Sequence, residues 1–521
     1  MPILPLLLYS VLAQEWPLTK AESTNYQETS SYADVVSFLD GLQRAGAPMR
    51  LEYIGTSTKG KPIPLVVAAR PLPSSPQDAA RMGRPIVYVQ ANIHAGEVEG
   101  KEAILHLLRR YSQEKEGILD KIVLLVNPIY NSDGNDEFGP QERHRPGQNG
   151  PAQVGLRPNG QGLDLNRDFV KAESPEMRAA LRSVWTAYRP HVMMDLHTTD
   201  GTRHGYPLTY APPLNPNGAT GLYEFGRDVF MPEVRSRLRA TGIETLDYGN
   251  DETRAGVRGW YVVGPEGRYS TNYAGLVDCI GVLSEAIVYD SFEKRIQSTE
   301  RFTDEVLQSA ARHSSHILDL AKQAADPDSV VARIEMGVRF ETRSRGVEDV
   351  LLERKTGERR TGPVTDIETV KMEVYDRFVA SRKTPVPEAF LLPADHQPVA
   401  ELLARHGVIV EQLDEEWRGQ VDEFVVSEAR QAAQPFQGHR LITLDGAFRG
   451  ATYTAAKGDY LVSIRQALGE LAFHILHPLG DDGALTWGFL GDEAPAVGSV
   501  FPIRLTDTPV LAARHRVPAP D

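Results

Sequence analysis

Apolar residues in the first 325 positions occur in short runs of strand length that alternate with amphipathic stretches of helical period. The runs that indicate buried strands, rich in β-branched and other apolar residues, are 85–93, 121–128, 191–197 and 281–288. The stretches with helical periodicity include 98–110, 175–190, 223–240 and 291–325. Such alternation is typical of an α/β domain. We therefore predict a mixed, largely parallel sheet flanked by helices.

The pattern changes near residue 326, at an Asp-Pro-Asp-Ser segment. From there to the C-terminus, short alternating runs are separated by Gly and Asp turns. This half of the chain is predicted to be an α+β or β-rich accessory region. The expected boundary separates residues 14–325 from residues 326–521.

The first residues form an apolar run of about a dozen residues, which is too short to span a bilayer as a mature helix. Val11 and Ala13 have the spacing required for cleavage after Ala13, although no Lys or Arg precedes the run. These features predict a signal peptide over residues 1–13 and export to the periplasm or the extracellular space. No other segment is long and apolar enough to predict a membrane span.

Charge and cysteine content restrict the possible partners and metal ligands. The 521 residues carry a formal charge of −14, which argues against nucleic acid or an anionic membrane surface as a partner. Cys279 is the single cysteine, so a metal site would have to use His, Asp and Glu.

Ionisable residues lie at or near the ends of three predicted strands. The first strand runs into His94-Ala-Gly-Glu97, the third ends at His197, and the fourth carries Glu285. In open α/β sheets, sites form outside the carboxyl ends of the strands, so these residues can converge in one crevice. Two imidazoles and a carboxylate, with a fourth position open, form a known catalytic zinc site. We therefore predict one Zn²⁺ per chain, held by His94, Glu97 and His197.

Glu285 lies in an apolar strand and is predicted to be a general base. Zinc lowers the pKa of water towards about 7 and polarises a carbonyl. A separate carboxylate must then take a proton from water and pass it to the leaving amine, and burial raises a carboxylate pKa towards that task. Each motif alone is a weak signal. Their order and their common position at strand ends support the hypothesis.

Together, these motifs resemble the zinc carboxypeptidases of the carboxypeptidase A type. The matching segments are His94-Ala-Gly-Glu97, Asn127-Pro, Asn131-Ser-Asp-Gly-Asn, Asp164-Leu-Asn166-Arg167-Asp168, Asp195-Leu-His197 and Ser284-Glu285-Ala286. The resemblance implies the fold of that family, the same zinc ligands and base, and hydrolysis that removes C-terminal residues from peptides. Residues 14–325 would then form the catalytic domain.

Further roles are implied by the resemblance alone. Asn166 and Arg167 would hold the free C-terminal carboxylate of a peptide substrate, which a planar guanidinium matches with two hydrogen bonds. Asp164 would support a zinc-binding imidazole. Another arginine would polarise the scissile carbonyl and stabilise the oxyanion. Three arginines lie in the right region: Arg143, Arg145 and Arg157. Of these, Arg145 is favoured.

Substrate preference stays open. The family places a mobile tyrosine over the substrate, and three tyrosines precede the last strand without an alignable motif: Tyr261, Tyr269 and Tyr273. Ser270, Thr271 and Asn272 indicate a polar pocket for the terminal side chain. Two other functions are considered: an amidase or deacylase acting on murein peptides or acylated amino acids, and a non-catalytic binding protein. Release of products from peptidoglycan fragments would indicate the amidase, and zinc binding without turnover would indicate the binding protein.

Overall fold

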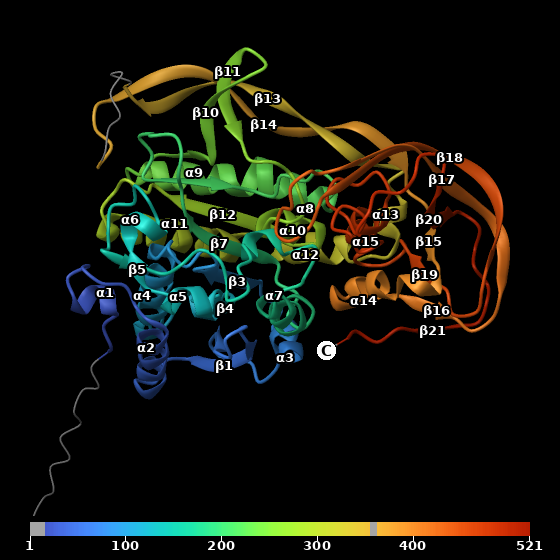
Figure 1. The fold of residues 1–521 in the computed structure, drawn as a ribbon. Helices are drawn as coiled ribbons and strands as arrows, with labels where there is room; N and C mark the ends of the chain where they lie inside the picture. Colours follow the sequence, from blue (N-terminus) through green and yellow to red (C-terminus); the bar gives the residue numbers. More distant parts are fainter. Residues whose placement is uncertain (1–15, 355–361, 521) are drawn as a thin grey trace, which may run out of the picture.

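A mixed sheet, sheet A, forms the centre of the first half of the molecule (Figure 1). The computed structural model describes residues 16–354 and 362–520, so the predicted signal peptide lies outside the described residues. Within those ranges sheet A has eight strands, in the order β1 (Met49–Thr56), β2 (Pro62–Ala68), β4 (Val123–Asn127), β3 (Ile86–Ala91), β7 (Val192–Thr198), β12 (Ile280–Ala286), β8 (Leu208–Ala211) and β9 (Thr245–Asp247). The four central strands β4, β3, β7 and β12 are parallel. The predicted mixed, largely parallel sheet is confirmed.

Both faces of sheet A are buried. Successive side chains on its central strands point to opposite faces, so each strand contributes to two apolar clusters. On β3, Val87 and Val89 join one apolar cluster, whereas Tyr88 joins another. The helices that pack on the first cluster include α2 (Tyr32–Arg44), α4 (Glu99–Gln113), α9 (Met231–Ala240), α11 (Phe292–Arg312) and α12 (Ser314–Ala324). The second cluster is covered by α7 (Pro175–Ala180), η3 (Leu181–Trp185), α10 (Ser270–Leu276) and the C-terminal half. Burial on both faces explains the continuous apolar runs in the sequence.

Local capping chemistry decides several helix boundaries. Helix α3 (Pro76–Arg81) forms in a segment rich in Pro and Ser, because the Ser75 side chain accepts the Asp78 N–H and Pro76 fits the first turn. The stretch read as one helix over 223–240 consists of α8 (Thr220–Phe225), η4 (Gly226–Phe230) and α9. The remaining short elements of this half include α1 (Lys20–Ser23), α5 (Ser132–Asp136), α6 (Gln141–His144), β5 (Gly139–Pro140) and β6 (Gln153–Val154).

The C-terminal half adds two sheets within the described part of the chain. Sheet C joins β10 (Gly249–Arg254) and β11 (Val257–Val262) to a long hairpin of β14 (Ile367–Pro385) and β13 (Glu335–Glu353), which arches over the first half (Figure 1). Sheet D has the order β18 (Ile442–Ala455), β17 (Trp417–Gln431), β20 (Val500–Thr506), β15 (Ala389–Leu392), β19 (Tyr460–Ser463), β16 (Glu411–Leu413) and β21 (Arg514–Arg516). Three helices accompany it: α13 (Asp328–Val331), α14 (Gln397–Arg405) and α15 (Gly469–Leu476).

The β-rich character expected of this half is confirmed. One apolar cluster nevertheless contains residues from both sides of the predicted boundary, among them Tyr88 on β3 and Phe390 on β15. The division into domains at residue 325 therefore stays a prediction.

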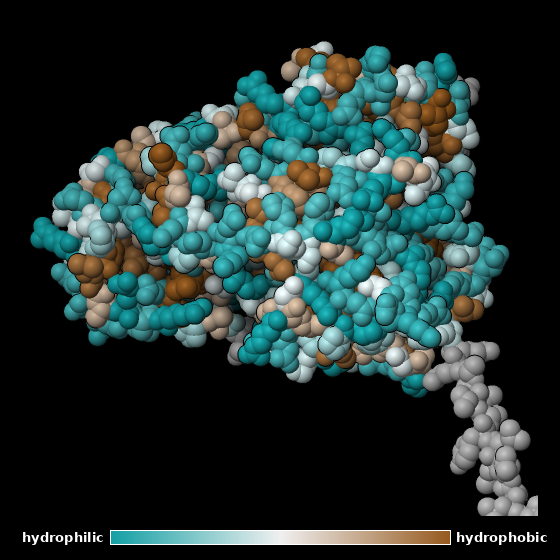
Figure 2. All heavy atoms as spheres, turned by 180° about the vertical axis from the view of Figure 1, so that it is seen from behind, coloured by the Kyte–Doolittle hydropathy of each residue, from teal (hydrophilic) through white to brown (hydrophobic). Residues whose placement is uncertain are grey.

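The surface seen from behind is mainly hydrophilic, with apolar residues in separate small groups (Figure 2). In the part of the chain that the structure describes, no helix has both the length and the apolar character needed to cross a bilayer.

Candidate active site

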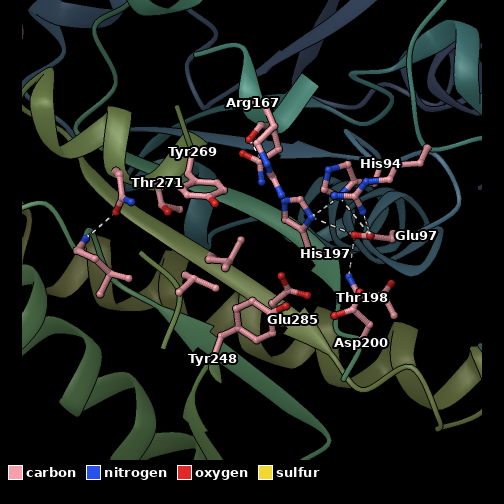
Figure 3. Close-up of a pocket in the computed structure, with 16 residues that line it drawn as sticks. His94, Glu97, Arg167, His197, Thr198, Asp200, Tyr248, Tyr269, Thr271 and Glu285 are labelled. Atoms are coloured by element: carbon pink, nitrogen blue, oxygen red, sulfur yellow. Dashed lines mark hydrogen bonds and ion pairs between the residues drawn. The ribbon is translucent and has the colours of Figure 1, made fainter. Parts of the chain in front are cut away.

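The predicted metal ligands lie together at the carboxyl ends of β3 and β7 (Figure 3). Directly after β3, Asn92 adopts a φ of 61°, and its side-chain amide donates to backbone carbonyls of the following turn. This turn directs His94 and Glu97 towards β7, where His197 is the penultimate residue. On the neighbouring strand, Glu285 is the register partner of His197. The sheet thus brings together four residues that are far apart in sequence.

The ligand atoms of His94, Glu97 and His197 converge. The Nδ1 atoms of the two imidazoles are 3.1 Å apart. The Nδ1 of His197 lies 3.0 Å from one carboxylate oxygen of Glu97, and the Nδ1 of His94 lies 3.2 Å from the other. All three residues are buried, and one ligand atom of each lies within 4.8 Å of the others. Two imidazole nitrogens and a carboxylate oxygen in this arrangement match the ligands of a zinc ion.

The other ring nitrogens face carboxylates. The Nε2 of His94 is 2.9 Å from Asp164, and the Nε2 of His197 is 2.9 Å from Asp195. Each imidazole therefore presents Nδ1 to the shared point and Nε2 to a carboxylate, as zinc-binding histidines commonly do. The contact of Asp164 is the one that the resemblance implies. The sequence analysis gave Asp195 no role, although it lies two residues before His197 and hence on the same face of β7. On these grounds the residues present fit a zinc ion.

A chain of hydrogen bonds connects the two supporting carboxylates. Ser270, the first residue of α10, donates its hydroxyl to Asp195 at 2.5 Å and its backbone N–H to Oδ1 of Asn166 at 3.0 Å. The backbone N–H of Asn166 donates to Asp164, also at 3.0 Å. The supports of both imidazoles are thus connected through Asn166, a residue expected to bind the substrate carboxylate.

Glu97 and Glu285 are both buried, but their pKa values move in opposite directions. Burial opposes a charge on Glu97, yet the neighbouring Arg145 and His94 hold its pKa well below the ordinary value. Burial raises the pKa of Glu285 well above the ordinary value; His197 opposes this shift and the charge of Glu97 adds to it. One Glu285 oxygen is buried and has no hydrogen-bond partner among the described residues. Two carboxylates with opposite shifts are typical of a site that performs acid–base chemistry.

Two of the candidate arginines contact Glu97 from different positions. Arg157 donates to Asp164 at 2.9 and 3.1 Å, lies 3.3 Å from Glu97, and lines the cavity of the site with 36% of its side chain exposed. Arg145 has 11% of its side chain exposed, lies 3.1 Å from Glu97, and donates to two backbone carbonyls just after His197. Within the described ranges, Arg145 does not line this cavity. The geometry thus favours Arg157, and not Arg145, as the arginine that reaches substrate.

The cavity beside these groups has a volume of about 190 Å³, and Asn166 and Arg167 lie in its wall. Because Oδ1 of Asn166 accepts the Ser270 N–H, the side-chain NH₂ is the group left to donate to a ligand. The Arg167 guanidinium lies 4.7 Å from the ring centre of Tyr269, which also lines the cavity. Both residues thus occupy positions suited to a carboxylate.

Only one of the three tyrosines considered lies at the cavity within the described residues, namely Tyr269. Tyr261 stacks on Tyr375 with ring centres 4.4 Å apart, and Tyr273 is buried with its hydroxyl 2.9 Å from His406. Tyr248, which no sequence motif distinguishes, lines the wall beside Glu285 (Figure 3).

Of the three residues expected to form a polar pocket, Thr271 and Asn272 line the cavity, whereas Ser270 does not among the described residues. The Ser270 hydroxyl donates to Asp195. The Asn272 side chain accepts the backbone N–H of Leu214 and donates to the backbone carbonyls of Gly264 and Glu266. The apolar residues of the cavity wall are Leu214, Val263 and Leu283. The cavity wall therefore combines these apolar side chains with the polar side chains of Thr271 and Asn272.

Comparisons with known proteins agree with this geometry. Residues 35–209 match the zinc carboxypeptidase family. Carboxypeptidase 2 of Trichophyton rubrum is 23% identical over 488 residues, which cover 88% of this chain and 84% of that protein. Carboxypeptidase D of Drosophila melanogaster is 30% identical over 190 residues, 34% of this chain and 12% of that protein.

Among solved structures, a metallo-carboxypeptidase from Pseudomonas aeruginosa in complex with (2-guanidinoethylmercapto)succinic acid is similar with a TM-score of 0.41 and 20% identity, over 56% of this chain and 70% of that chain. Carboxypeptidase A from Helicoverpa armigera has a TM-score of 0.40 and 15% identity, over 56% of this chain and 74% of that chain. Residues 35–209 thus match a zinc carboxypeptidase domain and the sequence relatives are carboxypeptidases, which together support a zinc metallocarboxypeptidase.

Proposed function

We propose that this enzyme removes C-terminal residues from peptides, with one zinc ion held by His94, Glu97 and His197. The observation that supports this most is the convergence of their ligand atoms beside a second buried carboxylate, Glu285. Zinc bound in such a site polarises a carbonyl and lowers the pKa of water towards about 7. The match of residues 35–209 to the zinc carboxypeptidase family supports the cleavage of C-terminal peptide bonds.

Glu285 is proposed to be the general base. Its raised pKa and its oxygen without a partner suit a group that accepts a proton from the attacking water. The protonated carboxyl then delivers this proton to the nitrogen of the leaving amine. The proton thus moves from water to product, and Glu285 returns to its initial state.

Arg157 is proposed to donate hydrogen bonds to the carbonyl oxygen as negative charge develops on it. Its position in the cavity wall, fixed by Asp164, leaves part of the guanidinium exposed to a ligand. Preorganised donors of this kind stabilise the transition state more than the bound substrate. Arg145 is proposed to hold Glu97 and the end of β7 in place instead.

Asn166 and Arg167 are proposed to bind the terminal carboxylate of the peptide. A charged group at this end of the cavity selects the last peptide bond, so cleavage is exo and not endo. Leu214, Val263 and Leu283, which line the cavity together with Thr271 and Asn272, favour an uncharged terminal side chain over a charged one. Export through residues 1–13 is a separate expectation, which fractionation of the expressing cells would test.

The first experiment is elemental analysis of the wild type, of His197→Ala and of His515→Ala, which alters an exposed histidine far along the chain. We expect one zinc per chain in the wild type and the control, and loss of zinc in His197→Ala. A panel of peptides that end in Leu, Phe, Lys or Glu, each with a free or an amidated C-terminus, then tests the substrate. Absence of metal in a folded, zinc-supplied wild type would contradict the proposal. Faster release of products from peptidoglycan fragments than from ordinary peptides would favour an amidase function.

A further inference from the structure

The loop between β17 and β18 ends in a tight turn. Phe436 and His439 exchange backbone hydrogen bonds of 2.7 and 3.0 Å. The central residues Gln437 and Gly438 have φ angles of 50° and 86°, the signature of a type I′ turn. Such a turn has little conformational freedom, so it presents its side chains in fixed directions.

The turn contacts both ends of the segment that carries Asn166 and Arg167. Oε1 of Gln437 accepts the backbone N–H of Asp164 at 2.8 Å. The Nε2 of His439 lies 2.9 and 3.0 Å from the two carboxylate oxygens of Glu173. Segment 164–173 is thus held at both ends by side chains from the other half of the chain.

A second wall of the cavity is held from the same side. The backbone N–H of Arg268 donates to the buried carboxylate of Asp482 at 2.5 Å, and its guanidinium lies 2.9 Å from the same group. That guanidinium also lies 5.5 Å from the ring centre of Phe436 and 4.9 Å from that of Trp487. The next residue is Tyr269, whose ring makes a cation–π contact with the guanidinium of Arg167. Both segments that flank the expected carboxylate site therefore depend on C-terminal residues.

From these contacts we infer that the turn Phe436–His439 positions Asn166 and Arg167 for the terminal carboxylate, so that the C-terminal half takes part in substrate binding. This inference rests on the proposed function. Recognition of a carboxylate by two hydrogen bonds requires the donors to lie within about 0.5 Å of their productive position. Arg167 has a long side chain with many rotamers, and fixing its backbone reduces the entropy lost on binding.

For His439→Ala the effect should appear in KM more than in kcat, because its partner Glu173 contacts neither a zinc ligand nor Arg157 in the described structure. Gln437→Ala also frees Asp164, which supports His94 and Arg157, so there a fall in kcat should accompany the rise in KM.

The test uses full-length Gln437→Ala and His439→Ala, with Gln434→Ala on the same exposed loop as the matched control. Loss of one such hydrogen bond should raise KM for a peptide with a free C-terminus by about threefold to tenfold in both variants, with kcat nearly unchanged in His439→Ala. Hydrogen exchange of peptides covering 164–173 should become faster in both variants and stay unchanged in the control. Zinc content and the unfolding temperature report whether the fold persists.

Unchanged KM together with unchanged exchange across 164–173 would overturn the inference. A fall in kcat without a rise in KM would also overturn it. If the wild type releases no C-terminal residue from any peptide, the proposed function fails, whereas the exchange measurement still decides whether the turn holds this segment.

Discussion

Replacement of Glu285 by Gln tests the chemistry of the site most directly. The side chains have nearly the same shape, so the packing beside His197 is retained while the proton acceptor is removed. The zinc ligands are not altered, and we expect one zinc per chain in the variant. We expect kcat to fall steeply with little change in KM, because the base acts in the transition state and not in substrate binding.

The expected loss is set by the burial of Glu285. General base catalysis contributes about 10²- to 10⁴-fold, or about 3 to 5 kcal/mol of transition-state stabilisation. Glu285 is buried and one of its oxygens has no hydrogen-bond partner among the described residues, so we expect the upper part of this range. Stability should not fall, because burial of a carboxylate charge is unfavourable and Gln carries none.

The pH dependence adds a second measurement. Burial raises the pKa of Glu285, and a base is active only when ionised, so wild-type kcat should rise with pH through a value above the ordinary 4.5 of a glutamate. Stopped assays across pH with purified, zinc-loaded protein would measure the pH dependence of wild-type kcat and the fall of kcat in Glu285→Gln. Turnover by Glu285→Gln within about tenfold of the wild type, in a preparation free of contaminating peptidase, would refute the assignment of the base.

Three further outcomes are expected. Arg157→Ala should lower kcat by about 10²-fold or more, as removal of an oxyanion donor does, whereas Arg145→Ala should mainly weaken zinc binding; equal kinetic effects would argue against the assignment. Ser270→Ala should weaken zinc binding by about 10- to 100-fold in a chelator competition, because Asp195 loses its partner, whereas Ser309→Ala in α11 should have no effect. Burial opposes ionisation of Glu173, but its imidazole and ammonium partners lower its pKa to about 2. Its contribution to stability should therefore be present above about pH 4.5 and be lost as pH falls towards 2; urea titrations of Glu173→Gln that show the same deficit at pH 7 and pH 2 would contradict this.

The sequence predicts the centre of the molecule well because the parallel strands β3, β7 and β12 give an unambiguous signal. Each is a short apolar run, and the ionisable residues that follow or end these runs are those that meet at the sheet edge: His94, His197 and Glu285. Strand alternation would also have indicated that Asp195, two residues before His197, lies on the same face of β7 and can support its imidazole.

The loops were less predictable. The segment that contains Arg145 and Arg157 has no periodicity, so spacing could not decide which guanidinium enters the cavity. Helix α15 is buried on all sides, and its short, mainly apolar sequence, interrupted only by Glu470 and His474, resembles that of a buried strand. The contact of Gln437 with Asp164 joins positions 273 residues apart, and no local pattern carries such information.

This long separation has a consequence for biosynthesis. The chain emerges from the ribosome N-terminus first, so strands, ligands and base are all made before the turn that supports segment 164–173. In a chain that ends before residue 437, segment 164–173 would lack the side chains that hold both of its ends. Full peptidase activity is therefore expected only once the chain has been made through His439.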